Sequence, residues 1–329
     1  MAPRFGSGAL QFELVEGWEQ LPAGWKHEDV AAVCTDDARN VFLYCRGDHP
    51  VMVYDQDGRF LDSWGEGKFS YRTHGMFMNG ENEIFCVDDS GNSVGRYATD
   101  GTLLQQIGSV GVLSDSGYDG ADMATITHGA PPYNRPTNLA VAPSGDLYVS
   151  DGYGNSRVHR FTDGGDLIQS WGEPGGGPGQ FRTPHSAWVH TDGRVFVADR
   201  QNDRVQIFDG EGNYLSEWLD VQRPQDIFID DAGLVYVGEL VYRKGDVSSR
   251  RGPIAEEEPS RISIYDLDGN VLLRWSDSDP SKDGFFIAPH GLWVDNEGSI
   301  YMAEVTNTIG VRPGLAPPDA HTFQKFARI

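Results

Sequence analysis

Cysteine is scarce in this chain of 329 residues. The three cysteines, Cys34, Cys45 and Cys86, are odd in number and show none of the short spacings of a cysteine–zinc motif. We expect buried, reduced thiols, as in a cytoplasmic protein, with a Cys34–Cys45 pair across neighbouring strands as the alternative. Cysteine therefore points to neither a metal site nor a disulfide framework.

Long apolar runs and positive charge are also lacking. No run is long enough to span a membrane, and the N-terminal segment has no apolar core of a signal peptide. The chain has only 26 Lys and Arg but 49 Asp and Glu, which gives a net charge of −23. This charge keeps a protein soluble and argues against nucleic acid and anionic membranes as partners. We expect a cytoplasmic protein, and the sequence leaves its oligomeric state open.

The chain has no long stretch of helical period, but it repeats itself about every 40 to 60 residues. A Pro-containing strand is followed by an Asp or Gly turn and an alternating strand, and later by a strand ending in Trp171, Trp218 or Trp275. Period-2 alternation between Gly, Asp and Asn turns predicts antiparallel strands. The clearest copies begin at residues 135–141, 183–189, 223–229 and 288–294.

Two weaker copies, residues 29–64 and 74–107, precede these four. Six four-stranded units predict an all-β, six-bladed β-propeller, formed as a single domain by residues 1–329. The last copy lacks a fourth strand after residues 323–329, and residues 12–18 have the composition to supply it. We therefore expect the N- and C-terminal strands to pair and close the propeller.

Three histidines, His74, His185 and His290, occupy the start of the first strand in repeats two, four and six. Alternate units of a ring would bring them together on the central axis. Three imidazoles are a ligand set for a divalent metal with an open coordination position. The alternative is that each histidine merely bonds a turn. The corresponding position elsewhere is roughly Glu28, Thr137 or Gln225, and the other six histidines are expected on the surface or in loops.

Arg46, Tyr153 and Arg200 each follow a second strand closely, and should lie on the same rim as the histidines. The insertions at residues 109–134, 240–259 and 309–322 should open there too. Singly, the tyrosine could be a turn residue and the arginines could pair with carboxylates. Beside a metal, positive charge favours a deprotonated phenol that can act as a base. Guanidiniums also suit a carboxylate-bearing substrate.

These motifs resemble peptidyl-α-hydroxyglycine α-amidating lyase (peptidylamidoglycolate lyase), a propeller built from NHL-type repeats. The likeness is closest over residues 135–208, and it extends more weakly over most of the chain through Arg46-Gly47-Asp48-His49 and the His74 and His290 segments. It implies Zn²⁺ ligands at His74, His185 and His290, a catalytic tyrosine at Tyr153, and active-site arginines at Arg46 and Arg200. Three departures stand out: Ala288 replaces a methionine near the metal, Gly291 an aspartate that binds a structural Ca²⁺, and Gly154 a half-cystine. The calcium is therefore left open.

The resemblance implies cleavage of the C–N bond of a carbinolamide, R–CO–NH–CH(OH)–R′, into an amide and an aldehyde such as glyoxylate. The partner expected from it is a small, carboxylate-bearing substrate. No Ser–His or Cys–His signature competes with this interpretation. Two alternatives stay open: a metal-dependent hydrolase or hydratase acting on a small carboxylate-bearing substrate, and a non-catalytic NHL propeller that binds protein.

Overall fold

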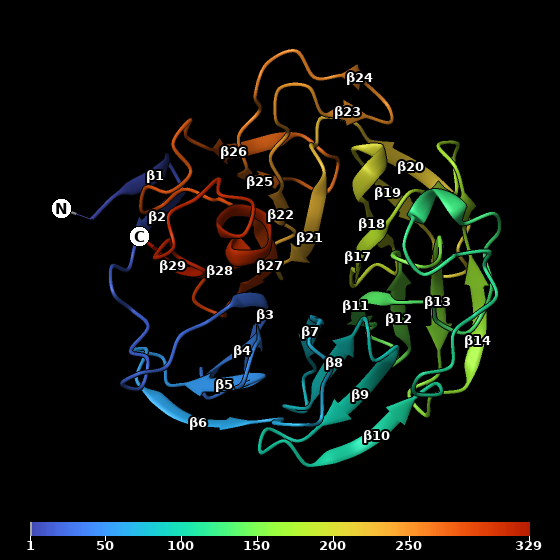
Figure 1. The fold of residues 1–329 in the computed structure, drawn as a ribbon, viewed down its shortest axis with the longest axis horizontal. Helices are drawn as coiled ribbons and strands as arrows, with labels where there is room; N and C mark the ends of the chain where they lie inside the picture. Colours follow the sequence, from blue (N-terminus) through green and yellow to red (C-terminus); the bar gives the residue numbers. More distant parts are fainter. Residues whose placement is uncertain (1) are drawn as a thin grey trace. The chain divides into compact units, whose positions relative to one another are not determined.

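The computed structural model describes residues 2–329, and its fold is an all-β, six-bladed β-propeller (Figure 1). The blades are antiparallel sheets that follow one another along the chain, as the repeat predicts. Tight turns join the strands, as at residues 190–193, where Gly193 has a φ of 88° and its N–H bonds the His190 carbonyl. Glycine favours such left-handed turns because it has no Cβ.

The chain divides into two compact units. Residues 1–68, 228–245 and 255–329 form unit 1, and residues 69–227 and 246–254 form unit 2. The expectation of a single domain stays a prediction. In the part of the chain that the structure describes, no helix has the length and apolar character needed to cross a membrane.

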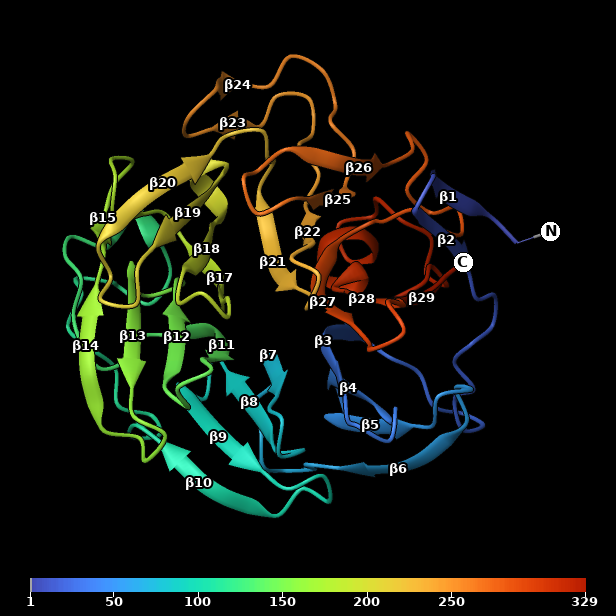
Figure 2. The same ribbon diagram turned by 180° about the vertical axis from the view of Figure 1, so that it is seen from behind.

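Unit 2 contains three complete blades (Figure 2). The first strands of these blades, β7, β11 and β17, lie next to one another, which makes them the inner strands of the unit. The blades consist of β7 (Thr73–Met78), β8 (Ile84–Asp88), β9 (Ser93–Tyr97) and β10 (Leu103–Ile107); β11 (Pro136–Val141), β12 (Leu147–Asp151), β13 (Arg157–Phe161) and β14 (Leu167–Trp171); and β17 (Pro184–Val189), β18 (Val195–Asp199), β19 (Arg204–Phe208) and β20 (Tyr214–Trp218).

Unit 2 also holds short elements in its connections. They are η1 (Met123–Thr125), β15 (Glu173–Pro174), β16 (Gln180–Phe181), η2 (Arg200–Asn202), β23 (Val247–Ser248) and β24 (Gly252–Pro253). The hairpin of β23 and β24 is held at Asp203, whose carboxylate accepts bonds from Ser248 and Arg251. The long connection before β11 carries η1 and runs where the sequence predicted an insertion.

Unit 1 contains the remaining strands, with the boundary between the units passing through β21 (Pro224–Ile229). One sheet consists of β3 (Asp29–Thr35), β4 (Val41–Arg46), β5 (Val51–Tyr54) and β6 (Phe60–Trp64). The sheet that begins with β21 continues with β22 (Val235–Glu239), β25 (Arg261–Tyr265) and β26 (Val271–Trp275). The third sheet consists of β27 (Pro289–Val294), β28 (Ile300–Glu304), β29 (Phe323–Arg328), β2 (Leu10–Leu14) and β1 (Arg4–Ser7). A short π-helical turn, η3 (Asn307–Val311), follows β28.

The predicted pairing of the chain termini is confirmed within unit 1, because β2 is antiparallel to β29 (Figure 1). Its bounds differ from the prediction: β2 spans Leu10–Leu14 rather than residues 12–18, and β1 adds a fifth strand that the sequence did not predict. Phe12 of β2 is buried, and its ring stacks on that of Trp275.

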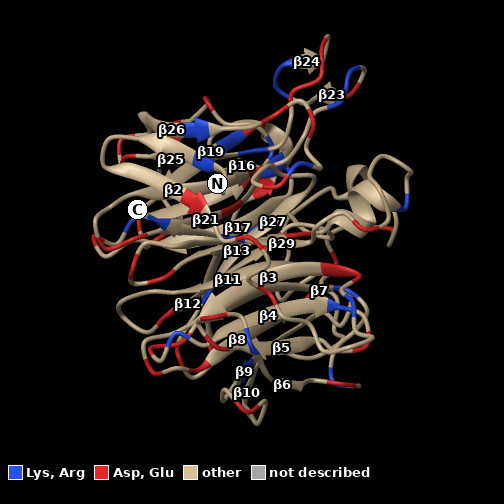
Figure 3. Ribbon diagram, turned by 90° about the vertical axis from the view of Figure 1, so that its left-hand side faces the viewer, with Lys and Arg blue, Asp and Glu red and all other residues tan. Residues whose placement is uncertain are grey.

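Inner and middle strands are largely buried, whereas the outer strands β6, β10 and β20 each contain two consecutive exposed residues. Every residue of the middle strands β4, β8, β12 and β18 is buried. Cys34, Cys45 and Cys86 are buried and none of the three forms a disulfide, so the alternative of a Cys34–Cys45 pair is wrong. Much of the acidic charge lies in the turns rather than in the strands, which are mostly uncharged (Figure 3).

Candidate metal and catalytic centre

A β-bulge sets the direction of the histidines in unit 2. Strand β17 pairs with β18 through Pro184 and then through Ser186, so that His185 is the extra residue between them. In β7 the register shifts between Thr73 and Met76, which places His74 in an equivalent irregularity. A bulge bends the strand and re-aims a side chain that would otherwise alternate with its neighbours. Both rings are buried.

Hydrogen bonds to the backbone fix the tautomer of both histidines. Nδ1 of His74 lies 2.5 Å from the Thr137 carbonyl oxygen, and Nδ1 of His185 lies 2.7 Å from that of Gln225. A carbonyl oxygen only accepts, so each Nδ1 must carry the proton. Each Nε2 therefore keeps its lone pair, the form of histidine that binds a metal, with a hydrogen-bonded second nitrogen.

The two imidazoles converge on the hydroxyl of Tyr153. The Tyr153 oxygen lies 3.1 Å from Nε2 of His74 and 3.1 Å from Nε2 of His185, and the two rings lie 4.7 Å apart. One hydroxyl proton can be donated to only one of these nitrogens at a time. Two basic nitrogens facing a single hydroxyl are suited to a shared cation, so the residues of unit 2 fit a divalent metal.

Tyr153 is positioned by a close approach of two backbones. It follows Gly152 at the end of β12, and a Cβ on Gly152 would lie 2.3 Å from the Pro184 carbonyl oxygen. Glycine therefore lets this turn pack directly against the strand that carries His185. On its other side the turn is held by a bond from the Gly154 N–H to the Asn134 carbonyl, at 2.9 Å.

Three arginines surround Tyr153, of which only Arg200 was predicted from the sequence. Nη1 of Arg200 donates to the Tyr153 oxygen at 3.1 Å, and its guanidinium carbon lies 5.2 Å from the ring centroid. The guanidinium carbons of Arg72 and Arg135 lie 5.2 and 5.7 Å from the same centroid. Both pair with Asp89, which is completely buried.

The charges of this cluster support one another. Burial opposes the charge of Arg72, but Asp89 and Tyr153 outweigh burial and raise its pKa. Burial also opposes the charge of Arg135, whose pKa is raised by Asp89 and by the Tyr118 hydroxyl and lowered in part by Arg72. The two guanidiniums thus repel each other and are held together by one carboxylate.

Unit 1 carries the other two predicted site residues. His290 is the extra residue of a bulge between β27 and β28, and its Nδ1 lies 2.7 Å from the Ala31 carbonyl oxygen. Its tautomer is therefore that of His74 and His185. Arg46, at the end of β4, donates from Nη1 to Asp29 at 3.2 Å and to Thr308 at 3.4 Å. Arg46 and His290 belong to a different unit from Tyr153.

One detail of the repeat differs from the prediction made from the sequence, and a second explains a glycine. The bulge between β3 and β4 lies between Val30 and Ala32, so Ala31 rather than Glu28 occupies the position of the histidines. Gly291 has a steric reason for its place, because a Cβ there would lie 2.5 Å from the Cα of Ala32. It brings β27 against β3 within unit 1, and it offers no side-chain oxygen to a calcium ion.

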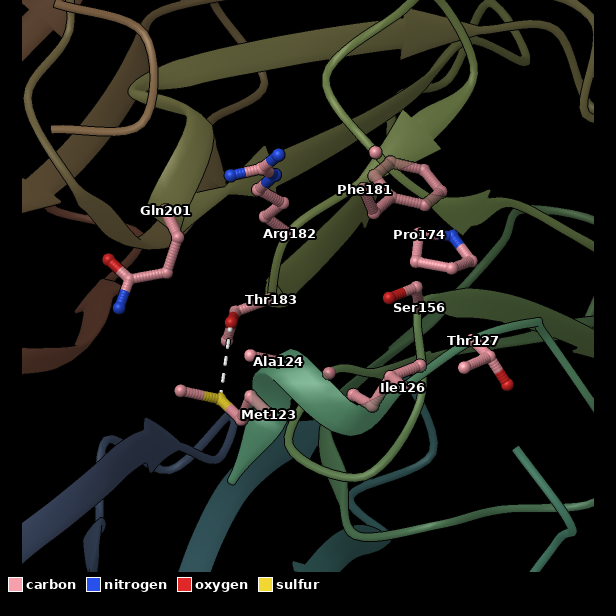
Figure 4. A pocket seen from close by; sticks show the side chains of 12 residues that line it. Met123, Ala124, Ile126, Thr127, Ser156, Pro174, Phe181, Arg182, Thr183 and Gln201 are labelled. Carbon is pink, nitrogen blue, oxygen red and sulfur yellow. Dashed lines mark hydrogen bonds between the residues drawn. The ribbon is translucent and has the colours of Figure 1, made fainter. Parts of the chain in front are cut away.

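A cavity of about 540 Å³ opens in unit 2 between η1 and the residues around Phe181 and Thr183 (Figure 4). Gly152, Thr183 and Met123 of η1 are among the residues that line it. Gly152 directly precedes Tyr153 in the sequence, and Thr183 lies two residues before His185. Apolar groups form much of the wall, notably Phe181 and Ile126. The Thr183 hydroxyl contacts the Met123 sulfur at 3.5 Å, so η1 reaches over this edge of the site.

The expectation that the remaining histidines lie on the surface is wrong for several of them. His159 is completely buried in β13, with Nε2 3.2 Å from Asp151. The His27 side chain is buried between Glu19 and the Cys45 thiol. The strand position of His159 holds Gln206 and Ser263 in two other repeats, and both of these polar residues are buried as well.

Comparison with known proteins agrees with the resemblance at modest identity. A family model for the NHL repeat matches residues 133–161. NHL repeat-containing protein 3 of Homo sapiens is 29% identical over 311 residues, which cover 87% of this chain and 81% of that protein. Peptidyl-alpha-hydroxyglycine alpha-amidating lyase 1 of Drosophila melanogaster is 26% identical over 268 residues, which cover 75% of this chain and 45% of that protein.

Among solved structures, virginiamycin B lyase from Staphylococcus aureus is similar, with a TM-score of 0.58 at 12% identity, covering 97% of this chain and 100% of that one. At this identity the likeness concerns the fold. The chain is therefore a propeller with an NHL repeat at residues 133–161, and its relatives include proteins named as peptidyl-alpha-hydroxyglycine alpha-amidating lyases.

Proposed function

We propose that this protein is a zinc-dependent carbon–nitrogen lyase that cleaves a carbinolamide, R–CO–NH–CH(OH)–COO⁻, into an amide and glyoxylate. The observation that carries the proposal is the convergence of His74 Nε2, His185 Nε2 and Arg200 Nη1 on the Tyr153 hydroxyl, each at 3.1 Å. The relatives named as lyases support the reaction class.

The proposed metal ligands are His74 and His185 of unit 2 and His290 of unit 1. Support comes from their shared tautomer, since each Nδ1 bonds a backbone carbonyl and each Nε2 keeps its lone pair. Zinc bound there would supply a Lewis acid toward a substrate oxygen.

Tyr153 is the proposed base. Its anionic oxygen takes the proton of the substrate hydroxyl, the O–H electron pair becomes the second C–O bond, and the C–N pair leaves with the nitrogen. The nitrogen then takes a proton, so the products are an amide and an aldehyde and no water is consumed. Arg200 donates to the Tyr153 oxygen and stabilises its negative charge throughout. Arg46 is included as an active-site arginine on the strength of the resemblance.

The cavity lined by Gly152, the residue before Tyr153, is the proposed site of the acyl group. Its volume, about 540 Å³, lies in the range of small-molecule sites, and Phe181 and Ile126 give it apolar walls. An N-benzoyl group is therefore a suitable acyl group for a first substrate.

The proposal is tested by glyoxylate release from N-benzoyl-α-hydroxyglycine. Protein supplemented with zinc should release glyoxylate, and Tyr153→Phe should lower the rate by about 10²–10⁴-fold or more, because it removes the base. Zinc content should be equal in the two proteins. Tyr148→Phe, which removes a hydroxyl bonded to the Gly210 carbonyl, is the control and should retain activity. Full activity of Tyr153→Phe would contradict the mechanism.

Two other functions give different results in the same assay. A hydrolase or hydratase would incorporate solvent oxygen, which mass spectrometry of products formed in ¹⁸O-labelled water would detect. A non-catalytic propeller is favoured by one observation: NHL repeat-containing protein 3, 29% identical, carries the name of a repeat and not of a reaction. That function predicts no aldehyde release and no change in melting temperature on adding zinc.

A further inference from the structure

We infer that Arg72 and Arg135, held by Asp89, form the site that binds the carboxylate of the substrate. This inference rests on the proposed function, and it names the residues that select an anionic substrate. Neither arginine belongs to the set that the sequence predicted. Arg72 lies two residues before His74, and Arg135 precedes Pro136 at the start of β11.

The two arginines are arranged symmetrically about one carboxylate. Nε and Nη2 of Arg72 each lie 2.7 Å from Oδ2 of Asp89. Nε and Nη2 of Arg135 lie 3.0 and 2.7 Å from Oδ1 of the same residue. Both forks are therefore oriented by Asp89, and the Nη1 side of each guanidinium points away from it. Nη1 of Arg135 contacts the Tyr118 hydroxyl at 3.1 Å.

The charge of the cluster is not balanced by its own residues. Arg72, Arg135 and Arg200 contribute three positive charges around the Tyr153 ring, and Asp89 is the carboxylate that pairs with the first two. The surplus is unusual in a protein with a net charge of −23. Holding cations side by side is unfavourable, and an anion bound between them relieves the repulsion.

The exposure of the side chains fits a site open to a ligand. Asp89 has a side-chain exposure of 0%, whereas the side chains of Arg72 and Arg135 are 31% and 23% exposed. The guanidiniums thus reach from a buried anchor to accessible space beside Tyr153. A planar, bidentate donor matches a carboxylate better than a point charge does.

The contrast with Arg46 favours this assignment. Arg46 is 4% exposed and donates to the buried Asp29, and Asp29 also accepts bonds from Thr308. That carboxylate holds one arginine, whereas Asp89 holds two. The pair in unit 2 is therefore the one with positive charge in excess.

The inference is tested by binding rather than by turnover. N-benzoylglycine, which keeps the carboxylate but lacks the reactive hydroxyl, and N-benzoylglycinamide, which lacks the charge, are titrated by calorimetry into zinc-supplemented protein. The wild type should bind the acid more tightly than the amide. Arg135→Gln should weaken binding of the acid by about 10- to 100-fold, the loss expected for a charge-assisted pair, and should leave binding of the amide unchanged.

Two further variants distinguish a loss of ligand binding from a loss of folded structure. Arg135→Lys keeps the charge that balances Asp89 but loses the fork, and should weaken binding of the acid without unfolding the protein. Arg194→Gln is the matched control, because the Arg194 side chain is 30% exposed and pairs with Asp192 in a turn. It should bind both probes like the wild type.

The outcomes separate this inference from the proposed function. Binding of the acid that depends on Arg135, without glyoxylate release from N-benzoyl-α-hydroxyglycine, would support the carboxylate site and contradict the lyase. Glyoxylate release that Arg135→Lys and Arg135→Gln leave unchanged would support the lyase and overturn the inference. Equal binding of acid and amide by the wild type would also overturn it.

Discussion

At the scale of single residues, the site depends on the extra residue of each bulge. A strand residue in regular register would alternate between the two faces of its blade. His74, His185 and His290 lie in register shifts instead, and each bonds a backbone carbonyl of another inner strand. One hydrogen bond thus fixes both the direction and the tautomer of the imidazole.

A prediction at this scale concerns His321, which lies 3.1 Å from the buried carboxylate of Glu304. Burial opposes the charge of His321, but Glu304 outweighs burial and raises its pKa above the usual 6.5. Protonation therefore favours the folded state. This stability is fully present below about pH 6.5, the unfolded pKa, and is lost as pH rises through the folded pKa.

Thermal melting between pH 5.5 and 8.5 checks this prediction. The melting temperature of the wild type should fall relative to that of His321→Gln as pH rises, because the variant has no proton to lose at this site. Parallel curves for the two proteins over this pH range would show that His321 contributes nothing to the dependence.

The residues of the site were predictable in part. Histidines in alternate repeats stand out in the sequence, and Tyr153 and Arg200 follow second strands in the same frame. Arg72, Arg135 and Asp89 did not stand out in the sequence, because arginines and aspartates are common in the turns of an acidic protein. A signal existed: Arg135 and Arg223 both precede the proline of an inner strand, at the same rim, and both have positive φ, 64° and 37°.

At the scale of elements, the repeat predicted the strands well because buried inner and middle strands carry a strong apolar pattern. The prediction was weakest at the N-terminus. Strand β1, Arg4–Ser7, consists largely of exposed residues, so no alternation marks it. The long connection at residues 109–134 was placed correctly, but its contacts with Arg135 and Thr183 depend on tertiary structure.

The pairing of the chain termini gives a prediction for β2. Phe12 is 0% exposed, and its ring centroid lies 6.0 Å from that of Trp275. Phe12→Ala should lower the free energy of unfolding by about 3–5 kcal/mol, since it leaves a cavity where β2 joins β29. Chemical denaturation measures this change.

Leu61→Ala is the control for this experiment, because Leu61 in the outer strand β6 is 52% exposed. Its effect should stay within about 0.5 kcal/mol. A loss at Phe12 no larger than that at Leu61 would mean that the strand from the N-terminus adds little to unit 1.

At the scale of the whole molecule, the distribution of charge and the sequence repeat both bear on the proposed site. The chain carries a net charge of −23, whereas three guanidiniums gather around Tyr153. The repeat distributes the proposed metal ligands between both units, with His74 and His185 in one and His290 in the other. Zinc binding is therefore the property of the whole chain on which the proposed function depends.

The most direct test is the zinc content of the purified protein beside three variants. We predict about one zinc per wild-type chain, in keeping with a three-histidine site. His185→Ala and His290→Ala should both lose it, because each removes a ligand from one unit. His190→Ala, in a turn, should retain it. A wild type without stoichiometric zinc after zinc addition, or a His290→Ala variant that keeps its full content, would contradict the proposed zinc site.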